Sequence, residues 1–394
     1  MITICQLLHS LNIGGAEVLA AALGRKMASE NFRFLFFCLD EEGEMAQLLR
    51  REGFLVECLG RRPGFDRRCM QKLRHLWQKY DVSLVHAHQY TPFFYALAAR
   101  GLRGKTPPIL FTEHGRFYPD LPNWKHKIFN RFWLKPDDRI VAVGQAVKDA
   151  LVENEGLPEE RIEVIYNGIN PENFKRTPER IAQGMRLRHE MGVPEGAKVF
   201  VHIARLDPIK DHLTAICTMN RFLFYATYGI LVPEDNSEAV LTDSQLWFVG
   251  QGPQENFIRE MIAKQGLEKN VKMLGLRKDI ASVLAAADAF LLTSVSEGIP
   301  VTILEAMAAS VPVVSTEVGG VNEIIMDGVH GRLAPSGKSE ILAEILYRLV
   351  TQKNLALVLI QNAHERLQKM FTQEKMHEKY RQVFLRMGIQ ENLT

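Results

Sequence analysis

Long hydrophobic runs, paired cysteines and a strong charge of either sign are all missing from this sequence. No run of about 18 apolar residues occurs, so no helix is expected to span a membrane. The five cysteines stand far apart, without the spacing of a zinc site or a disulfide framework, which suits a reducing cytoplasm. A formal net charge of only +2 argues against a nucleic-acid binder. The amino terminus, "MITICQLLHSLNIGGAE", has no basic start before its short apolar run, so we interpret it as a buried strand and not as a signal peptide.

What the sequence does contain is an alternation of short apolar runs with longer amphipathic ones, such as "AEVLAAALGRKMA". This alternation is typical of parallel sheets with helices on both faces. The expected strands are "ITICQLL", "FRFLFFCL", "FLVEC", "SLVHAH", "PILFTEH" and "RIVAVG", and later "KVFVHIA", "QLWFVG", "VKMLG", "AFLLTS" and "PVVST".

The alternation pauses at Asn167-Gly168, a turn signal that Pro171 follows. Because 394 residues exceed what one core usually serves, the sequence predicts two doubly wound, Rossmann-like α/β domains facing a central cleft. Their expected bounds are 1–168 and 169–374, and a helix over 375–394 is expected to cross back to the first domain. Residues 222–244 fit this pattern poorly, and we expect an irregular helix and a surface loop there.

In open α/β sheets, ligands bind beyond the carboxyl ends of the strands, so candidate residues are sought there. After the first strand, Gly14 and Gly15 allow a tight turn into a helix whose free amides could face an anion; a plain strand–helix turn is the alternative. Asp40 ends the second strand roughly where a dinucleotide-binding fold carries its ribose-binding acid. The spaced three-glycine fingerprint is missing, however, which disfavours a nicotinamide cofactor.

Histidines end two strands of the predicted first domain. His114, in "FTEHGRF", could reach a cleft, or it could be a structural histidine satisfied by backbone groups. His86 and His88 alternate along the preceding strand with a spacing that matches some metal pairs, but no cysteine or carboxylate cluster completes a site. We expect one of these two histidines to face the core and the other to reach the cleft edge at most.

Cations follow the first strand of the predicted second domain, in "HIARLDPIKDH". The planar guanidinium of Arg205 and the compact ammonium of Lys210 would suit a diphosphate. A solvated pair, held by Asp207 and Asp211, is the alternative.

Two further loops of this domain are candidates for ligand contact. In "FVGQGP", a glycine loop from Gly250 to Pro253 follows a strand. In "LGLRKDI", Arg277 and Lys278 end a strand before a helix that Asp279 could cap.

Two glutamates flank a helix start in "SVSEGIPVTILEAMAASVPVVSTEVGG", Glu297 and Glu305, with seven residues between them. The segment Gly298, Ile299 and Pro300 is expected to begin a helix whose free amides can hold a phosphate or sugar hydroxyls. A hydrolase acid and base stand roughly 5 to 10 Å apart across one bond. Six or so helical residues already span about 9 Å, and the loop adds more. The pair therefore fits better along one ligand, with Glu297 near a sugar and Glu305 near a ribose diol.

These residues resemble glycosyltransferase family 4, the retaining enzymes with a GT-B fold, over nearly the whole chain. The glutamate pair with its surrounding Gly-x-Pro and Glu-Ala-Met-Ala is the most specific match. The other matching segments are "IGGAE" at 13–17, "EHG" at 113–115, "RLDPIK" at 205–210, "VGQGP" at 249–253, "VGGVNEII" at 318–325 and "DGVHGRLAP" at 327–335. Ala204, Asp211 and Gln251 stand where the family more often has Gly, Gly and Asp.

The resemblance implies that Arg205 and Lys210 hold the donor diphosphate, while Glu305 binds the ribose and Glu297 the transferred sugar. The backbone near Arg277 would meet the base. Gly15 would lie near the phosphate and His114 near the sugar, and the first domain would serve the acceptor. The expected function is transfer from a nucleoside-diphosphate sugar, for which we expect a UDP-sugar, to a glycan, lipid-linked or small-molecule acceptor in glycan or cell-envelope polysaccharide biosynthesis.

The sequence has no Asp-x-Asp, the usual carboxylate pair of metal-dependent transferases with a single sheet domain. We therefore expect no metal and no cofactor besides the donor, because Arg205 and Lys210 would stabilise the leaving diphosphate instead. Two alternatives stay open: a nucleotide-sugar epimerase, which acts without an acceptor, and a nucleotide-sugar-binding protein that has lost its chemistry.

A cytoplasmic location is expected, peripheral on the inner face of a membrane if the first domain contacts lipid. Residues 61–80 are rich in Lys and Arg, and residues 123–134, "NWKHKIFNRFWL", place aromatic side chains among cations. Such a helix can lie in an anionic membrane interface. The alternative is that its aromatic side chains pack on the sheet and the basic run is a solvated face.

Overall fold

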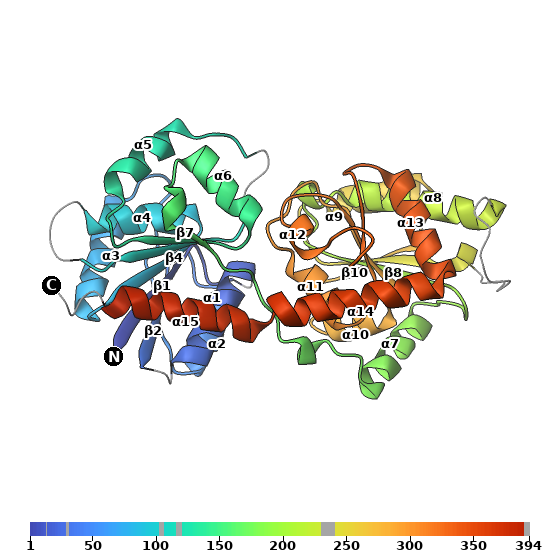
Figure 1. The fold of residues 1–394 in the computed structure, drawn as a ribbon, viewed down its shortest axis with the longest axis horizontal. Helices are drawn as coiled ribbons and strands as arrows, with labels where there is room; N and C mark the ends of the chain where they lie inside the picture. The colour runs from blue at the N-terminus through green and yellow to red at the C-terminus, as the bar shows by residue number, and fades with distance from the viewer. Residues whose placement is uncertain (13, 29–30, 102–105, 116–119, 230–240, 390–394) are drawn as a thin grey trace. The chain divides into compact units, whose positions relative to one another are not determined.

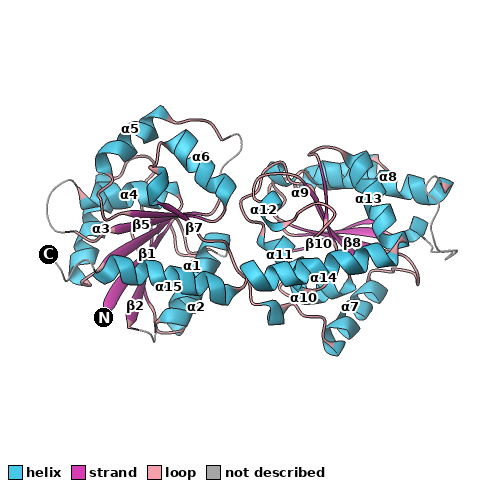
Figure 2. Cartoon of the chain, in the orientation of Figure 1, coloured by secondary structure: helices cyan, strands magenta, loops and turns pink. Residues whose placement is uncertain are grey.

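The computed structural model describes residues 1–12, 14–28, 31–101, 106–115, 120–229 and 241–389. The chain divides into two compact units: Met1–Tyr166 with Lys375–Thr394, and Asn167–Glu374. Each unit is a parallel sheet with helices packed on it (Figures 1 and 2).

The first unit is built on described strands in the order β3-β2-β1-β4-β5-β6-β7. These strands are β1 (Ile2–Leu8), β2 (Phe32–Cys38), β3 (Leu55–Cys58), β4 (Leu84–His88), β5 (Ile109–Glu113), β6 (Arg139–Ala142) and β7 (Ile162–Val164). The helices are α1 (Gly15–Met27), α2 (Glu44–Arg51), α3 (Arg67–Lys79), α4 (Tyr90–Arg100), α5 (Trp124–Trp133), α6 (Gln145–Glu155) and the short η1 (Glu159–Arg161), with α15 (Gln373–Ile389) returning from the far end of the sequence.

Helix α15 completes the hydrophobic core of this first unit. Its buried side chains join those of β1, β2, α1 and α2 in one cluster. The ring of Phe384 stands edge-on to Phe32 and to Phe34, with centroids 6.0 Å away in both cases. The amino-terminal sheet thus depends on apolar residues from the last helix of the chain.

The second unit is a parallel sheet with described strands in the order β10-β9-β8-β11-β12-β13. These strands are β8 (Val199–Ile203), β9 (Gln245–Val249), β10 (Val271–Gly275), β11 (Ala289–Leu292), β12 (Val313–Thr316) and β13 (Arg332–Ala334). The helices are η2 (Pro171–Asn173), α7 (Pro178–Glu190), η3 (Pro208–Lys210), α8 (His212–Tyr228), η4 (Leu241–Asp243), α9 (Glu255–Lys264), α10 (Ile280–Ala286), α11 (Val301–Ala308), α12 (Val321–Ile324), α13 (Ser339–Thr351) and α14 (Lys353–Met370).

The secondary structure differs from the sequence-based expectation at two edge strands and in the region that begins at residue 222. Strands β7 and β13 were not expected, because each has only three residues at the edge of its sheet, too few for an apolar run. The irregular helix expected from residue 222 is wrong, since α8 continues regularly to Tyr228. Most of the loop expected after it, 230–240, lies outside the described residues. Within the described part of the chain, no helix combines the length and apolar character needed to cross a bilayer.

Candidate functional site

In the second unit the strand order reverses between β8 and β11, which makes their carboxyl ends the switch point of the sheet. Chain segments leaving these two strands carry the predicted residues Lys210 and Glu297. Their side chains meet there: Lys210 Nζ donates to Glu297 Oε1 over 2.6 Å, with side-chain exposures of 22% and 9%. The structure therefore unites two groups that lie 87 residues apart in the sequence.

Two hydroxyl residues after β11 hold this ion pair, and sequence reasoning missed both. Ser294 Oγ donates to Glu297 Oε1 over 2.6 Å. The Thr293 hydroxyl lies 2.8 Å from the Asp211 carbonyl oxygen and 3.1 Å from that of Lys210. Asp211 itself caps α8 by accepting from the Thr214 amide, with its backbone in the left-handed region. These contacts fix the end of η3 against β11, so Lys210 is presented from a rigid turn. The one available signal in the sequence was a hydroxyl pair directly after a buried strand.

Arg205 follows β8 but does not join this pair. Its side chain is 75% exposed, and its Nε lies 3.0 Å from Asp207 Oδ2. The solvated pair considered for Arg205 is therefore what the structure contains, whereas Lys210 pairs with a different partner. Arg205 could bind an anionic ligand in one of two ways. Its guanidinium could turn away from Asp207, or it could donate to Asp207 and to the ligand at the same time.

The double glycine after β12 is explained by close backbone packing. A Cβ at Gly319 would overlap the carbonyl oxygen of Glu297, and one at Gly320 would overlap that of Gly298. The Gly320 amide donates to the Glu297 carbonyl oxygen over 3.2 Å. Gly319 also has a φ of +46°, which favours glycine. These two glycines therefore position the loop that carries Glu297.

Gly250, after β9, has the same role beside β8. Its φ is +147°, and a Cβ there would overlap the carbonyl oxygen of Ala204. Its amide donates to the Gly275 carbonyl oxygen over 2.9 Å. The glycine loop thus lies directly against the segment that leads into Arg205.

Glu305 lies in the second turn of α11, for which Pro300 is the N-cap and before which Ile299 is buried. Its carboxyl group is partly buried and has no hydrogen-bond partner among the described residues. Burial raises the pKa of Glu305 to about 7. A partly buried carboxylate without a hydrogen-bond partner is stabilised when hydroxyl groups of a ligand donate to it.

Arg277 and Asp279, after β10, pair with each other. Arg277 Nε and Nη2 donate to the two Asp279 oxygens over 2.8 and 2.6 Å. The expectation that Asp279 caps α10 is wrong, because its side chain makes no cap hydrogen bond and serves Arg277 instead. Lys278 is exposed beside them.

In the first unit, Gly14 is the N-cap of α1 and Gly15 its first residue. A Cβ at Gly14 would come within 2.5 Å of Glu17 Oε2, so the Glu17 carboxyl group lies at this helix start. Burial raises the pKa of Glu17. An anion at this end of α1 would have to displace that side chain.

Asp40 cannot serve a ribose as it stands. Its carboxylate accepts from Arg61 Nε over 2.6 Å and lies 3.1 Å from His9 Nδ1. Burial opposes ionisation of Asp40, but the hydrogen bonds from Arg61 and His9 outweigh it and lower its pKa. This structural ion pair removes the remaining support for a dinucleotide site.

His114 ends a chain of hydrogen-bonded side chains from three neighbouring strands. His88 Nδ1 lies 2.9 Å from His114 Nε2, and His88 Nε2 lies 2.6 Å from Gln6 Oε1. Burial lowers the pKa of His114 to about 4, so the ring is neutral near pH 7. With the Gln6 amide oriented as it is here, His114 donates to His88 and keeps Nδ1 as an acceptor.

The expectation for the other two histidines is half wrong. Both His86 and His88 are buried, at 0% and 1% exposure, so neither reaches a cleft edge. His88 contacts His114 instead. Gln6, inside β1, gave no signal in the sequence because an isolated polar residue in a mostly apolar strand does not reveal its partner.

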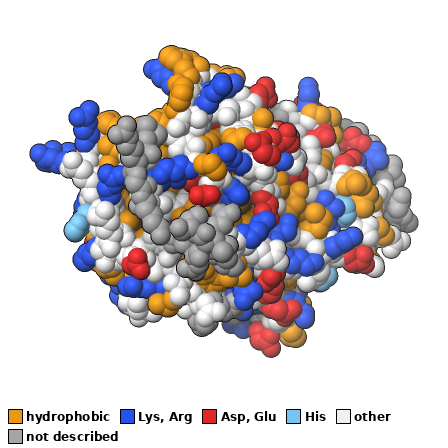
Figure 3. Space-filling view, turned by 60° about the vertical axis from the view of Figure 1, so that its left-hand side comes forward, with side chains coloured by type: hydrophobic (Ala, Val, Ile, Leu, Met, Phe, Trp, Pro, Cys, Tyr) orange, Lys and Arg blue, Asp and Glu red, His pale blue; other side chains and the backbone are white. Residues whose placement is uncertain are grey.

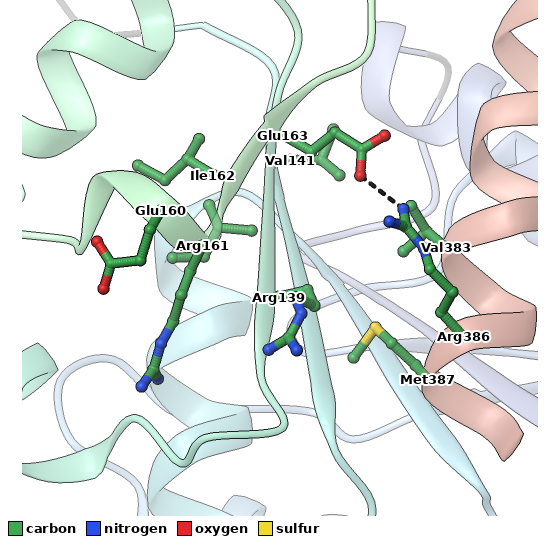
Figure 4. Close-up of a pocket in the computed structure, with 10 residues that line it drawn as sticks. Arg139, Val141, Glu160, Arg161, Ile162, Glu163, Val383, Arg386 and Met387 are labelled. Atoms are coloured by element: carbon green, nitrogen blue, oxygen red, sulfur yellow. Dashed lines mark hydrogen bonds and ion pairs between the residues drawn. The ribbon is translucent and has the colours of Figure 1, made fainter. Parts of the chain in front are cut away.

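A cavity of about 640 Å³ lies elsewhere in the first unit, at β6, β7 and α15. Arg139, Arg161 and Arg386 line it, and Arg386 Nη2 donates to Glu163 over 2.7 Å (Figure 4). None of the predicted site residues lines this cavity, so we assign the site by the chemistry at the switch points and not by cavity size. No cluster of three or more potential metal-ligating side chains occurs in the part of the chain that the structure describes.

The two doubly wound parallel sheets have the architecture of the GT-B fold. Comparison with known proteins gives the family. Residues 13–173 match the model of Glycosyltransferase Family 4, and residues 198–352 match that of Glycosyl transferases group 1. The chain belongs to glycosyltransferase family 4, and it is an enzyme that uses a nucleotide-sugar donor in glycan biosynthesis.

Individual relatives are distant but cover most of the chain. N-acetyl-alpha-D-glucosaminyl L-malate synthase of Bacillus anthracis is 25% identical over 385 residues, covering 95% of this chain and 94% of that protein. UDP-Gal:alpha-D-GlcNAc-diphosphoundecaprenol alpha-1,3-galactosyltransferase of Escherichia coli is 24% identical, covering 82% and 80%. Among solved structures, Anabaena HepE in complex with UDP and glucose has a TM-score of 0.79 and 23% identity, covering 97% of this chain and 99% of that one. A glycosyltransferase from Rickettsia africae has a TM-score of 0.81 and 21% identity, covering 98% of both chains.

Proposed function

We propose that this enzyme moves a sugar from a UDP-sugar to a glycan, lipid-linked or small-molecule acceptor, with retention of anomeric configuration. The observation that carries the proposal is the Lys210–Glu297 pair at the switch point of the second sheet. HepE, which was solved with UDP and glucose, supports the choice of UDP. In this proposal the second unit binds the donor, the first unit serves the acceptor, and the enzyme works in the cytoplasm.

The leaving diphosphate would be stabilised by cations of the second unit. Lys210 has three N–H donors, so it can keep Glu297 and still donate to phosphate oxygens. Arg205 would add its guanidinium by turning away from Asp207. Fixed donors aimed at a developing negative charge lower the barrier for its departure.

The two glutamates would accept hydrogen bonds from opposite parts of the donor. Glu297 is held by Lys210 and Ser294 and would accept from hydroxyls of the transferred sugar. Glu305 would accept from the ribose diol, which supplies the partners that its carboxyl group lacks. The loop of Arg277 and Lys278 would contact the base of the donor. Neutral His114 would contact the transferred sugar. Gly14 and Gly15 would lie near the phosphate.

Transfer is expected to continue in the presence of EDTA, because Lys210 and Arg205 supply the positive charge at the diphosphate. Purified enzyme would be screened with a panel of nucleoside-diphosphate sugars and acceptors, and the anomeric configuration of the product read by NMR. Loss of transfer with EDTA and its recovery with Mg²⁺ or Mn²⁺ would overturn the charge assignment. An inverted product would overturn retention.

Donor affinity is expected to fall on acidification, because only ionised Glu305 accepts two hydroxyl hydrogen bonds. Its pKa of about 7 is raised by burial, so the protonated form dominates below that value and the ionised form above it. The dissociation constant of a UDP-sugar should therefore rise about tenfold from about pH 8 to about pH 6. Calorimetry with the sugar nucleotide measures this, since its diphosphate diester does not titrate in this range. The Glu305→Gln variant should bind the UDP-sugar with little pH dependence. If its affinity changes as steeply with pH as that of the wild type, a group other than Glu305 is responsible.

A further inference from the structure

Helix α5 of the first unit turns its polar side chains inward. The ring of His126 stacks on Tyr90 with centroids 4.0 Å apart, and its Nδ1 lies 2.6 Å from a Glu155 oxygen. Asn130 is fully buried, accepts from the Tyr90 hydroxyl over 3.0 Å and donates to the Glu155 carbonyl oxygen over 2.9 Å. These hydrogen bonds fix which face of α5 points away from the protein.

The outward face of α5 is apolar. Trp124, Ile128 and Phe132 recur every four residues and so form one stripe, with exposures of 66%, 51% and 70%. Leu121, just before the helix, is 69% exposed. The alternative that the aromatic side chains of this helix pack on the sheet is therefore wrong for this stripe. An amphipathic helix of a soluble domain normally has the opposite orientation, with its apolar stripe toward the core.

Cations border this stripe. On a helical projection, Lys125 and Arg131 lie at its two margins, and both are exposed. Phe65, itself 59% exposed, is linked to α5 by ring contacts through Phe94. Figure 3 shows apolar side chains at the upper edge of the view, over α5, with Lys and Arg on both sides.

Phe65 brings a second group of cations to the patch. Arg62, Arg67 and Arg68 surround it in the sequence and are exposed. The acid among them, Asp66, is engaged as the N-cap of α3 by the amides of Arg68 and Cys69. Arg61, by contrast, is held by Asp40 and is only 17% exposed, so it belongs to the fold and not to this surface.

We propose that the surface formed by Leu121, Trp124, Ile128, Phe132 and Phe65 docks on an anionic membrane. Large apolar side chains with a tryptophan, bordered on both sides by Lys and Arg, match the two layers of a bilayer surface, acyl chains below and anionic headgroups around. The inward hydrogen bonds of His126 and Asn130 hold the helix in the orientation that this contact requires. The proposal does not depend on which sugar the enzyme transfers.

The test is cosedimentation of the full-length protein with phosphatidylcholine vesicles, with and without phosphatidylglycerol. Binding should need the anionic lipid and weaken as salt rises. The pair Ile128→Glu and Phe132→Glu should reduce binding at least about tenfold, because acids replace apolar groups in an anionic interface. Met185→Glu with Leu357→Glu is the matched control in the second unit, since these side chains are 66% and 63% exposed. Arg67→Glu with Arg68→Glu should weaken binding to anionic vesicles.

Tryptophan fluorescence gives an independent readout of which helix enters the lipid. Trp124 is 66% exposed, whereas Trp77 and Trp247 are 3% and 0% exposed and Trp133, at the end of the same helix, is half-buried and stacks on Phe129. Brominated lipids should therefore quench the wild-type protein, and Trp124→Phe should remove most of this quenching while binding persists. The proposal would be overturned if the wild-type protein did not bind anionic vesicles at low salt. It would also be overturned if the control variant lost as much vesicle binding as the stripe variant. If the stripe variant instead turns a dimer into a monomer in analytical ultracentrifugation, the surface covers a second copy and the membrane assignment is wrong.

Discussion

Replacing Lys210 by alanine is expected to lower kcat by about 10²–10³-fold, the usual loss when one preorganised donor to a developing charge is removed. The affinity for UDP should fall as well, because the same ammonium would contact the diphosphate before and after transfer. The variant also leaves Glu297, only 9% exposed, without its charged partner. Steady-state kinetics with saturating acceptor and calorimetry with UDP measure the two effects.

Arg205→Ala is the matched comparison for this prediction. Arg205 follows the same strand but is 75% exposed and already paired with Asp207, so its loss should cost less than that of Lys210. A double-mutant cycle of Lys210→Ala with Glu297→Ala separates direct contact with the donor from loss of the ion pair. If Lys210→Ala leaves both UDP affinity and kcat unchanged, the proposal that Lys210 contacts the diphosphate is wrong.

Gly320→Ala is expected to reduce transfer about hundredfold, even though the change adds a single methyl group. The added Cβ overlaps the Gly298 carbonyl oxygen and must push the loop that carries Glu297, and a displacement of about 1 Å at a reacting centre costs about that factor. The φ of Gly320 is −71°, so the backbone itself accepts alanine and the effect comes from the overlap. Rate measurement with a thermal-unfolding control separates loop displacement from global destabilisation.

Gly337→Ala provides the control for this substitution. Gly337 has a φ of +76°, and a Cβ added there would have no neighbouring atom within 4 Å, so alanine is strained but meets nothing. We expect it to lower stability modestly and leave transfer unchanged. Equal loss of activity in both variants would mean that the double glycine acts through stability and not through Glu297.

The sequence was sufficient to predict the two parallel sheets. Lys210, Glu297 and Glu305 could be proposed as candidates because each follows an apolar run, near a turn or a helix start. The pairing of Lys210 with Glu297 could not be predicted, since it depends on β8 and β11 becoming neighbours across 87 residues of intervening chain. Their supports, Thr293 and Ser294, gave too weak a signal for the same reason.

The direction in which side chains point was the second feature that the sequence could not predict. The composition of α5 suggested both a core helix and a surface helix, and the choice was made by Tyr90 and Glu155, which hold His126 and Asn130 inward. Likewise, Asp279 is the N-cap residue of α10, but its carboxylate accepts from the guanidinium of Arg277 and makes no cap hydrogen bond. Local patterns could name these residues, but only their tertiary partners decide which way each side chain points.

Helix α15 has a consequence for the order in which the protein can fold during synthesis. The second unit is one continuous segment, Asn167–Glu374, so its core residues are translated before those of α15. The first unit begins earlier but ends later, because its sheet waits for apolar side chains from the last helix: Met376, Tyr380, Val383, Phe384 and Met387. The sheet that is translated first therefore completes its core only when α15 has emerged, and until then its apolar face stays exposed and could be covered by a chaperone.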